Sequence, residues 1–306
     1  MSDFEESRLK IKELEQEILS LDSNSPEYNK LNRELNILKE KTFSNLSHWE
    51  KVLIARSEDR VRSSSLVKKL LNNFIEFHGD EYYSEDASII AGIGFLKDMP
   101  VTVLAQAKGK NLQDSLKRNF GMTSPEGFRK TLRLAKEAEK FNRPILTIVD
   151  TSGAYPGKGA EERGQARAIA QNLMEFSKLK TPVIAIVLSE GGSGGALALT
   201  VSDYIFMFEN AIYSVLSPEG FSSILFKNKV SAEDAANIMK LTSSDLKELN
   251  IIDEIINEPL GGIKVFNSEF INDLRNKIYD KFVELKSKNI DELLEDRYQK
   301  FRKMGC

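Results

Sequence analysis

The feature that most constrains this chain is a glycine-rich corner within residues 181–199. Val183 to Leu188 is a short run of β-branched and aliphatic residues, typical of a strand that is buried on both faces. The small and apolar residues from Gly195 to Val201 predict a tightly packed helix. A strand that enters a helix through glycines leaves backbone N–H groups free at the positive end of the helix dipole, so we expect an anion or oxyanion site. The residues of this corner are Gly191, Gly192, Ser193, Gly194 and Gly195.

A second glycine-containing corner, Asp150-Thr-Ser-Gly-Ala-Tyr-Pro-Gly157, follows the strand expected at Pro144–Val149. Ligands of α/β proteins collect at the carboxyl ends of the strands. Two such corners in one chain therefore favour an oxyanion site.

The corner at Gly191 to Gly195 has other possible interpretations besides an oxyanion site. The Walker phosphate loop needs a Gly-Lys-Ser/Thr sequence, which does not follow here, and the dinucleotide fingerprint needs a different glycine spacing. Gly191 to Gly195 does match the nucleophile elbow of serine hydrolases, but both histidines precede Ser193, whereas in that fold the histidine follows the serine. The glycines also fit a purely structural role, in which they only let a helix pack closely on a sheet.

Composition narrows the class of protein. The formal net charge of −3 gives no general attraction for nucleic acid or membranes, and no apolar run is long enough to span a bilayer. The single cysteine, Cys306, leaves no internal disulfide framework and no cysteine-based metal site. With no signal-peptide pattern at the start, the sequence predicts a soluble, cytoplasmic protein without a metal.

The first part of the chain is expected to be helical. Apolar spacings of three and four predict a helical hairpin over residues 3–41, with Ser25 and Pro26 at the start of its second helix, and further helix over 47–77. Strands are expected at Ser88–Leu96 and Val101–Ala107.

A helix from Ser124 to Phe141 follows, with Arg129 and Arg133 on a basic face that is either solvated surface or a phosphate contact. After it we expect a helix near 161–179, strands at 204–208, 212–215 and 251–256, and terminal helices near 266–286 and 290–303. The pentapeptide Ser-Pro-Glu-Gly-Phe occurs at both 124 and 217, which we interpret as a shared helix cap. These elements predict an α/β fold divided into a helical arm (1–86), a core (87–262) and C-terminal helices (263–306).

Seven phrases, in one order along the chain, carry a family resemblance. They are Arg118–Met122, Pro125–Lys130, Asp150–Gly157, Gly159–Gln165, Glu190–Ala198, Tyr213–Gly220 and Glu258–Gly262. With them the chain resembles the α-subunit family of the bacterial-type acetyl-coenzyme A carboxylase carboxyltransferases. Three positions depart from the family pattern: Ser152, Phe221 and Phe226.

The resemblance implies a crotonase-type fold, a spiral of repeated ββα units with paired backbone amides that form oxyanion holes. It implies transfer of a carboxyl group from carboxybiotin, on a biotin carboxyl carrier protein, to acetyl-CoA, which gives malonyl-CoA for fatty acid synthesis. A β subunit that carries zinc would complete an α2β2 enzyme, and a separate biotin carboxylase would use ATP.

The resemblance also assigns roles to residues. The amides of Gly191 to Gly195, with those of Gly153 and Ala154, would hold the ureido oxygen of biotin. Arg129 and Arg133 are candidate contacts for coenzyme A phosphates. Further residues are expected near biotin: Tyr155, Pro156, Gly157, Ser217, Pro218, Glu219 and Gly220.

Other functions stay open at this point. A serine-dependent hydrolase or another acyl-CoA enzyme of the same fold would use the same corner, and propionyl-CoA would serve as well as acetyl-CoA. A non-catalytic scaffold that recruits partners through its helical hairpin is the third possibility.

Overall fold

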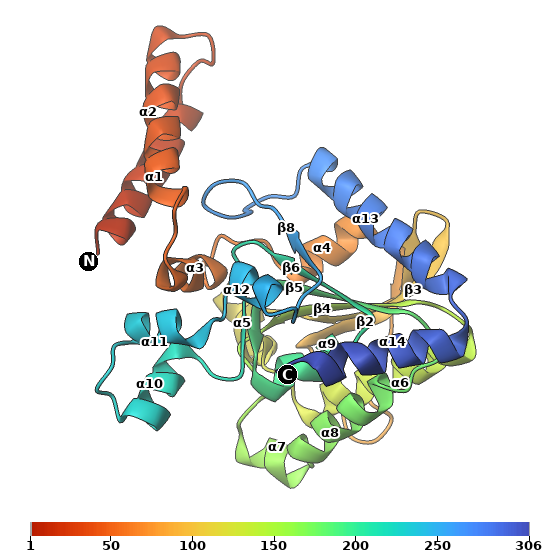
Figure 1. Cartoon of the computed structure of the whole chain (residues 1–306). Helices are drawn as coiled ribbons and strands as arrows, with labels where there is room; N and C mark the ends of the chain where they lie inside the picture. The colour runs from red at the N-terminus through yellow and green to blue at the C-terminus, as the bar shows by residue number, and fades with distance from the viewer. Residues whose placement is uncertain (1, 306) are drawn as a thin grey trace.

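The structure, a computed structural model, describes residues 2–305 (Figure 1). Cys306, on which the redox argument depends, lies outside the described residues. The strands are β1 (Asn72–Glu76), β2 (Ile89–Leu96), β3 (Met99–Gln106), β4 (Ile145–Thr151), β5 (Val183–Gly192), β6 (Tyr204–Phe208), β7 (Ile212–Ser214) and β8 (Glu254–Ile256).

The helices before β5 are α1 (Asp3–Leu19), α2 (Pro26–Phe43), α3 (His48–Ala55), α4 (Ser63–Leu70), α5 (Leu112–Lys117), the 3-10 turn η1 (Asn119–Gly121), α6 (Pro125–Lys140), α7 (Lys158–Glu162) and α8 (Gln165–Phe176). Those after it are α9 (Ser193–Thr200), α10 (Pro218–Phe226), α11 (Ala232–Met239), α12 (Ser243–Glu248), α13 (Ser268–Ser287) and α14 (Ile290–Lys303). In the described part of the chain, no helix is both long and apolar enough to cross a membrane.

All eight strands belong to one mixed sheet in the order β1-β2-β3-β4-β5-β6-β8, and β7 pairs with the far end of β5. The β2 strand runs antiparallel to its neighbours β1 and β3, and the pairs from β3 onward are parallel. Because α4 and α13 cover one face and α6, α8 and α9 the other, β4 is buried along its whole length (Figure 1). Strands covered on both faces read as continuous apolar runs, which explains why β4 and β5 were predictable from sequence.

Two successive strands followed by a helix occur twice, but only β2 and β3 pair with each other. The β2–β3 hairpin precedes α6, and β6 and β7 precede α10. Each of the two helices begins at a Ser-Pro-Glu-Gly-Phe pentapeptide. The prediction that both serines cap their helices is confirmed for Ser217 and wrong for Ser124. The Ser217 hydroxyl accepts a hydrogen bond from the Gly220 N–H, whereas the Ser124 side chain forms no capping hydrogen bond. The repeated peptide therefore marks a helix start in both places, although the strands before it differ: β2 and β3 pair antiparallel, whereas β6 and β7 both run parallel to β5.

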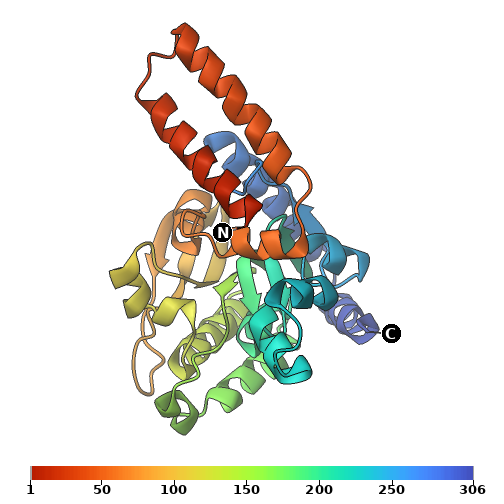
Figure 2. The same ribbon diagram turned by 90° about the vertical axis from the view of Figure 1, so that its left-hand side faces the viewer.

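The predicted helical hairpin is confirmed as α1 and α2, which project from the body and contact it at their base, where Arg8 donates to Ser57 (Figure 2). Ser25 caps α2 by accepting from the Tyr28 N–H, with Pro26 in the first turn, as expected. The buried seam between the two helices contains Ile11, Leu14 and Leu35.

Two helix predictions are wrong. The helix expected over 47–77 ends at Leu70, and Asn72–Glu76 forms β1 at the edge of the sheet; Asn73, at φ +51°, takes a backbone conformation that a helix does not allow. The helix expected near 161–179 is interrupted at Gly164, whose φ of +86° separates α7 from α8. The loop after β3 contains the short helix α5, which its polar sequence did not reveal.

The C-terminal helices are confirmed, and a buried arginine fastens α14 to the sheet. Arg297, only 1% exposed, donates two hydrogen bonds to the Asp203 carboxylate at 2.7 and 2.8 Å. Its remaining N–H groups donate to the carbonyls of Phe176, Leu179 and Thr181, in the segment that leads into β5. The division into residues 1–86, 87–262 and 263–306 stays a prediction, although β1 and α14 tie the outer segments to the sheet.

Candidate functional site

The two glycine corners lie in direct contact at the carboxyl ends of β4 and β5. A Cβ atom added to Gly192 would lie 2.1 Å from the Ser152 carbonyl oxygen, and one added to Gly195 would lie 2.5 Å from the Ala154 nitrogen. No side chain fits at such distances, so glycine is required at both positions. Gly194 differs, because its added Cβ would meet only Ile169 at an ordinary 3.5 Å. The structure thus brings together the two corners that the family resemblance assigned to one oxyanion site.

The amides of the β4 corner are used to hold the corner itself. The Gly153 N–H donates to Thr151 Oγ1 at 3.0 Å, and the Tyr155 N–H donates to the Thr123 carbonyl at 2.9 Å. Gln165 Nε2 then donates to the carbonyls of Thr123 and Tyr155, both at 2.9 Å. The Gly153 N–H thus already has a partner in the same corner, and its expected role as an oxyanion donor stays a prediction.

The amides of the β5 corner are not capped. No side chain caps the N-terminus of α9, whose first residues are Ser193, Gly194 and Gly195. Ser193 has φ +55°, so the chain turns sharply there between strand and helix. Gln106 fixes the corner, because its Nε2 donates a hydrogen bond to the Gly195 carbonyl oxygen at 2.8 Å. This arrangement leaves N–H groups at the positive end of α9 without side-chain acceptors.

Two cavities share Ser193 in their walls. A cavity of about 210 Å³ is lined by the end of β5, by Arg56 and by the segment after β7. A more apolar cavity of about 410 Å³ lies beyond Ser193 and Gly194, with Leu197, Tyr213 and Phe221 among its lining residues. Both also share Ser214 and Val215.

The residues expected near biotin divide into two groups. Ser217 lines the smaller cavity, and Gly220 and Glu219 follow it at the start of α10, where Pro218 is buried. Tyr155, Pro156 and Gly157 lead into α7 and line neither of these two cavities. Ser152, in the same loop, does line the smaller one.

A buried charge network beside the corner was missed by the sequence reasoning. Glu190, 8% exposed, accepts from Arg56 Nε at 2.8 Å and also pairs with Lys108. Lys108 lies 3.8 Å from the fully buried Asp150, and Arg56 also pairs with Glu219 on α10 at 2.7 Å. Burial alone would raise the pKa of Glu190, but attraction to Lys108 and Arg56 outweighs it and holds that pKa below its usual value.

In the sequence, the only sign of this network is that Asp150 and Glu190 each lie at a strand end beside a glycine corner. Their cationic partners lie 42 to 134 residues away in the sequence, so no local pattern connects them. Arg56 ends α3, and Lys108 follows β3.

Neither histidine forms a hydrogen bond or ion pair with Ser193 in the described part of the chain. His48 Nε2 lies 2.9 Å from Asp245, and His78 Nδ1 lies 3.6 Å from Glu85. The positive φ of Ser193 is typical of the strained turn of a nucleophile elbow, whereas the glycines around it had argued against such a turn. A base for that serine is nonetheless missing from its hydrogen-bond partners.

Arg129 and Arg133 are held by acidic and carbonyl groups. Arg129 donates to the buried Asp80 carboxylate at 2.7 Å, and Arg133 donates to the Gly79 carbonyl at 2.9 Å and lies 3.6 Å from Glu81. Both line a cavity of about 610 Å³ away from the glycine corners. A phosphate at Arg129 would have to displace Asp80.

Comparison with known proteins identifies the family. A family model described as acetyl co-enzyme A carboxylase carboxyltransferase-like matches residues 1–305. The acetyl-coenzyme A carboxylase carboxyl transferase subunit alpha of Alkaliphilus oremlandii (strain OhILAs) is 49% identical over 315 residues, which cover 100% of this chain and 99% of the relative. In Natranaerobius thermophilus a protein named as subunits beta/alpha is 50% identical over 260 residues, which cover 85% of this chain and 43% of the relative.

Solved structures establish the fold. The transcarboxylase 12S structure matches with a TM-score of 0.60 at 18% identity and covers 73% of this chain and 41% of its own. A Pseudomonas malonate decarboxylase hetero-tetramer matches with a TM-score of 0.57 at 17% identity and covers 69% of this chain and 84% of its own. These likenesses confirm the predicted crotonase-type fold. With the full-length match of sequence, they lead to one conclusion: the chain belongs to the family of acetyl-coenzyme A carboxylase carboxyltransferase α subunits.

Proposed function

We propose that this chain is the α subunit of a carboxyltransferase that moves a carboxyl group from carboxybiotin to acetyl-CoA and gives malonyl-CoA. The observation that supports it most is the uncapped first turn of α9 at the contact between the two glycine corners. A relative at 49% identity over the whole chain bears that subunit's name. Malonyl-CoA formation is the committed step of fatty acid synthesis, so the chain would serve lipid metabolism.

The donor set suits an oxygen that gains negative charge. The N–H groups of Ser193, Gly194 and Gly195 belong to the first turn of α9, where the helix dipole adds to their attraction for an anion. Ala154 lies against Gly195 from the second corner. Carboxybiotin is a substrate carried by another protein; it would supply the carboxyl group, and its ureido oxygen is the anionic atom that these amides would hold.

The cavities fit the two ends of such a substrate. The smaller cavity brings polar backbone and Ser217 to the corner, whereas the larger one offers the apolar surface of Leu197, Tyr213 and Phe221. A bicyclic ureido ring with an apolar tail needs both kinds of surface. Biotin contacts with Ser217 to Gly220 remain part of the proposal, and Tyr155 to Gly157 would act by supporting the Ala154 loop.

The β4 corner would keep the site rigid. Thr151 Oγ1 accepts from Gly153 and donates to the Gly121 carbonyl at 2.7 Å, so both chain segments are fixed against β5. An oxyanion hole works by pre-oriented dipoles that need no reorganisation when charge develops. Gly153 thus positions the wall of the site, with its own N–H directed inward to Thr151.

The enzyme would need a β subunit. Relatives named beta/alpha join both subunits in one chain, which supports direct contact between them. The finer parts of the proposal are an α2β2 assembly in the cytoplasm, a biotin carboxyl carrier protein, a biotin carboxylase that uses ATP, and zinc on the β subunit. The β subunit would hold the enolate oxygen of acetyl-CoA. Arg129 and Arg133, paired as they are, have little capacity left for coenzyme A phosphates.

The test is reconstitution with a matched pair of variants. The chain is co-purified with a β subunit and assayed for malonyl-CoA from carboxybiotin and acetyl-CoA. Gly195→Val places a branched side chain against Ala154 and should remove activity, whereas Gly194→Ala should retain most of it. Full activity of a folded Gly195→Val enzyme would contradict the oxyanion role, and propionyl-CoA in parallel assays decides the acyl preference.

A serine hydrolase is the second candidate, favoured only by the positive φ of Ser193. Labelling of Ser193 by a fluorophosphonate probe would support it. A reconstituted complex that forms but makes no malonyl-CoA would favour a scaffold.

A further inference from the structure

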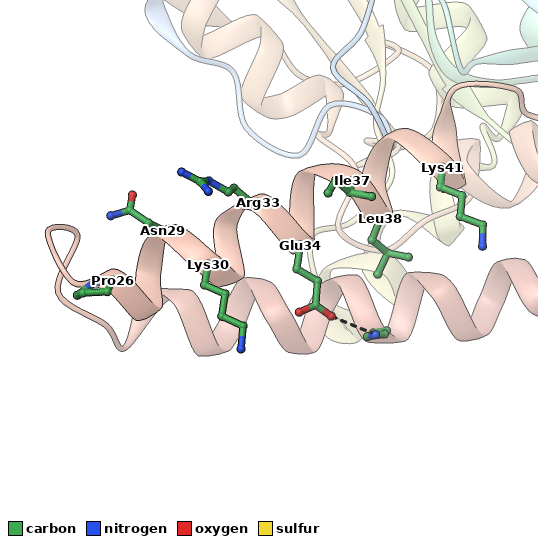
Figure 3. A pocket seen from close by; sticks show the side chains of 9 residues that line it. Pro26, Asn29, Lys30, Arg33, Glu34, Ile37, Leu38 and Lys41 are labelled. Atoms are coloured by element: carbon green, nitrogen blue, oxygen red, sulfur yellow. Dashed lines mark ion pairs between the residues drawn. The ribbon is translucent and has the colours of Figure 1, made fainter.

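The outer face of α2 carries a stripe of cations without partners. Lys30, Arg33, Ile37 and Lys41 are spaced i, i+3, i+7 and i+11, which places them on one face of a helix. All four are exposed, Ile37 by 71%, and they line a groove of about 660 Å³ (Figure 3). Within residues 2–305 none of the three cations forms an ion pair, whereas the neighbouring Glu34 pairs with α1.

Helix α1 carries a second stripe of the opposite sign. Glu6, Leu9, Glu13 and Glu17 have the same spacing of i, i+3, i+7 and i+11 and are all exposed, Leu9 by 49%. These three carboxylates also have no ion-pair partner in the described chain. Each stripe therefore combines three unpaired charges with one exposed apolar side chain, over about 16 Å of helix.

The two stripes match when they run antiparallel. The residue numbers of each facing pair then sum to 46 or 47, so one register satisfies all four pairs. Every charge meets its opposite, and the apolar residues meet each other. The facing pairs are Glu6 with Lys41, Leu9 with Ile37, Glu13 with Arg33, and Glu17 with Lys30.

The stripes do not meet within one chain. The two helices of the hairpin already face each other through the seam of Ile11, Leu14 and Leu35, so the stripes point outward from it. The hairpin projects from the body, which leaves room for another protein along its length (Figures 1 and 2). An element that carries complementary charges on two exposed stripes can form an isologous contact with a copy of itself, because each stripe then meets its opposite.

We propose that the arm binds the arm of a second copy of this chain. The α1 of each copy lies antiparallel on the α2 of the other, and the four helices form a bundle with a two-fold axis along its length. Such an interface is isologous, because the same two stripes are buried on both sides. It does not depend on the carboxyltransferase activity.

The test uses charge reversal in the full chain, measured by sedimentation velocity over a range of concentrations. One variant reverses the basic stripe (Lys30→Glu, Arg33→Glu, Lys41→Glu) and another the acidic stripe (Glu6→Lys, Glu13→Lys, Glu17→Lys). Each alone would set like charges opposite each other, so we expect its self-association to fall by at least about tenfold. An equimolar mixture of the two should associate again, because each copy then supplies the charge that the other lacks.

A single-charge control and a cross-link sharpen the result. Arg33→Glu should weaken association, whereas Lys12→Glu, the same change of charge off the stripe, should not. In a chain with Cys306→Ser, Leu9→Cys with Ile37→Cys should give a disulfide-linked dimer, and Leu19→Cys with Ile37→Cys should not. A monomeric wild-type chain, or reversals without recovery on mixing, would overturn the proposal; the second result would assign the stripes to a different protein.

Discussion

The two glycine corners have similar sequences but use their amides in opposite ways. After β4, the N–H groups of Gly153 and Tyr155 donate within the corner or to the adjacent Thr123. After β5, the N-terminus of α9 has no side-chain cap. The N–H groups of Gly153 and Tyr155 in the β4 corner are thus already bonded, whereas the β5 corner presents donors that no side chain accepts. The comparison teaches that glycine content identifies a close contact between segments, while the hydrogen bonds decide which segment can bind an anion.

The largest effect should follow from filling the contact between the corners. Gly192→Ala places a Cβ 2.1 Å from the Ser152 carbonyl oxygen, so one corner must move away from the other. Loss of an aligned oxyanion donor lowers the rate about 100- to 1,000-fold. Steady-state assays of the reconstituted enzyme measure it, and Gly194→Ala serves as the control with space for its methyl group. Equal activity of the two variants would show that the contact is not needed.

A smaller effect should come from the wall itself. Thr151→Val removes a hydroxyl that donates to the Gly121 carbonyl at 2.7 Å and accepts from the Gly153 N–H at 3.0 Å, while it keeps the shape of the side chain. Burying these groups without partners costs about 1–3 kcal/mol, measured as the free energy of unfolding in urea. Thr151→Ser retains the hydroxyl and should stay near wild type. Thr151→Val leaves the Gly153 N–H without its acceptor. Full activity of this variant would show that the β4 corner does not need its internal hydrogen bond, which would contradict the distinction between the two corners.

The pH dependence of stability tests the charges beside the β5 corner. Because the pKa of Glu190 is lowered in the folded protein, its contribution to stability is present above the unfolded pKa of about 4.3 and is lost as the pH falls through the folded value. Glu190→Gln should therefore be less stable than wild type at neutral pH, and the difference should shrink below about pH 4. Thermal unfolding over pH 3–8 measures it. A constant difference would mean that Glu190 is neutral when folded.

The smallest effect concerns Ser193. Its φ of +55° is unfavourable for a residue with a Cβ, so Ser193→Gly should raise stability by up to about 1 kcal/mol. Ser193→Ala should change carboxyl transfer little, since the amide and not the hydroxyl is the proposed donor. Abolished activity in Ser193→Ala with an intact fold would return the hydroxyl to the mechanism.

Sequence predicted the parts of the fold that local patterns determine. The buried strands β4 and β5, the arm and the C-terminal helices all follow from periodicity, and Ser25 with Pro26 fixed the start of α2. The β1 strand was mistaken for helix because Phe74 and Ile75 continue an apolar spacing that begins in α4. Its strand pairing depends on β2, which lies more than ten residues further on.

Within the site, the resemblance indicated that the two corners belong together, but not which of their amides are already hydrogen-bonded. The acceptor for Gly153 is a threonine hydroxyl whose orientation is set by the Gly121 carbonyl, 30 residues away. Arg56 and Lys108 could not be assigned to Glu190 for the same reason. The repeated Ser-Pro-Glu-Gly-Phe peptide correctly predicted two helix starts, but the serine side chain caps the helix only at Ser217.

The arginine of α14 has a consequence for the order of events during synthesis. The guanidinium of Arg297 satisfies three carbonyls that precede β5 and the carboxylate of Asp203. Until it arrives, a buried carboxylate and these carbonyls lack their partner, and breaking such a buried pair typically costs about 3–5 kcal/mol. When synthesis has passed β8 but not reached α14, all the strands of the sheet are therefore present, but Arg297 is not yet there to pair with Asp203. The last helix therefore completes the contacts of the sheet, and we expect a chain that ends before Arg297 to be less stable than the full chain.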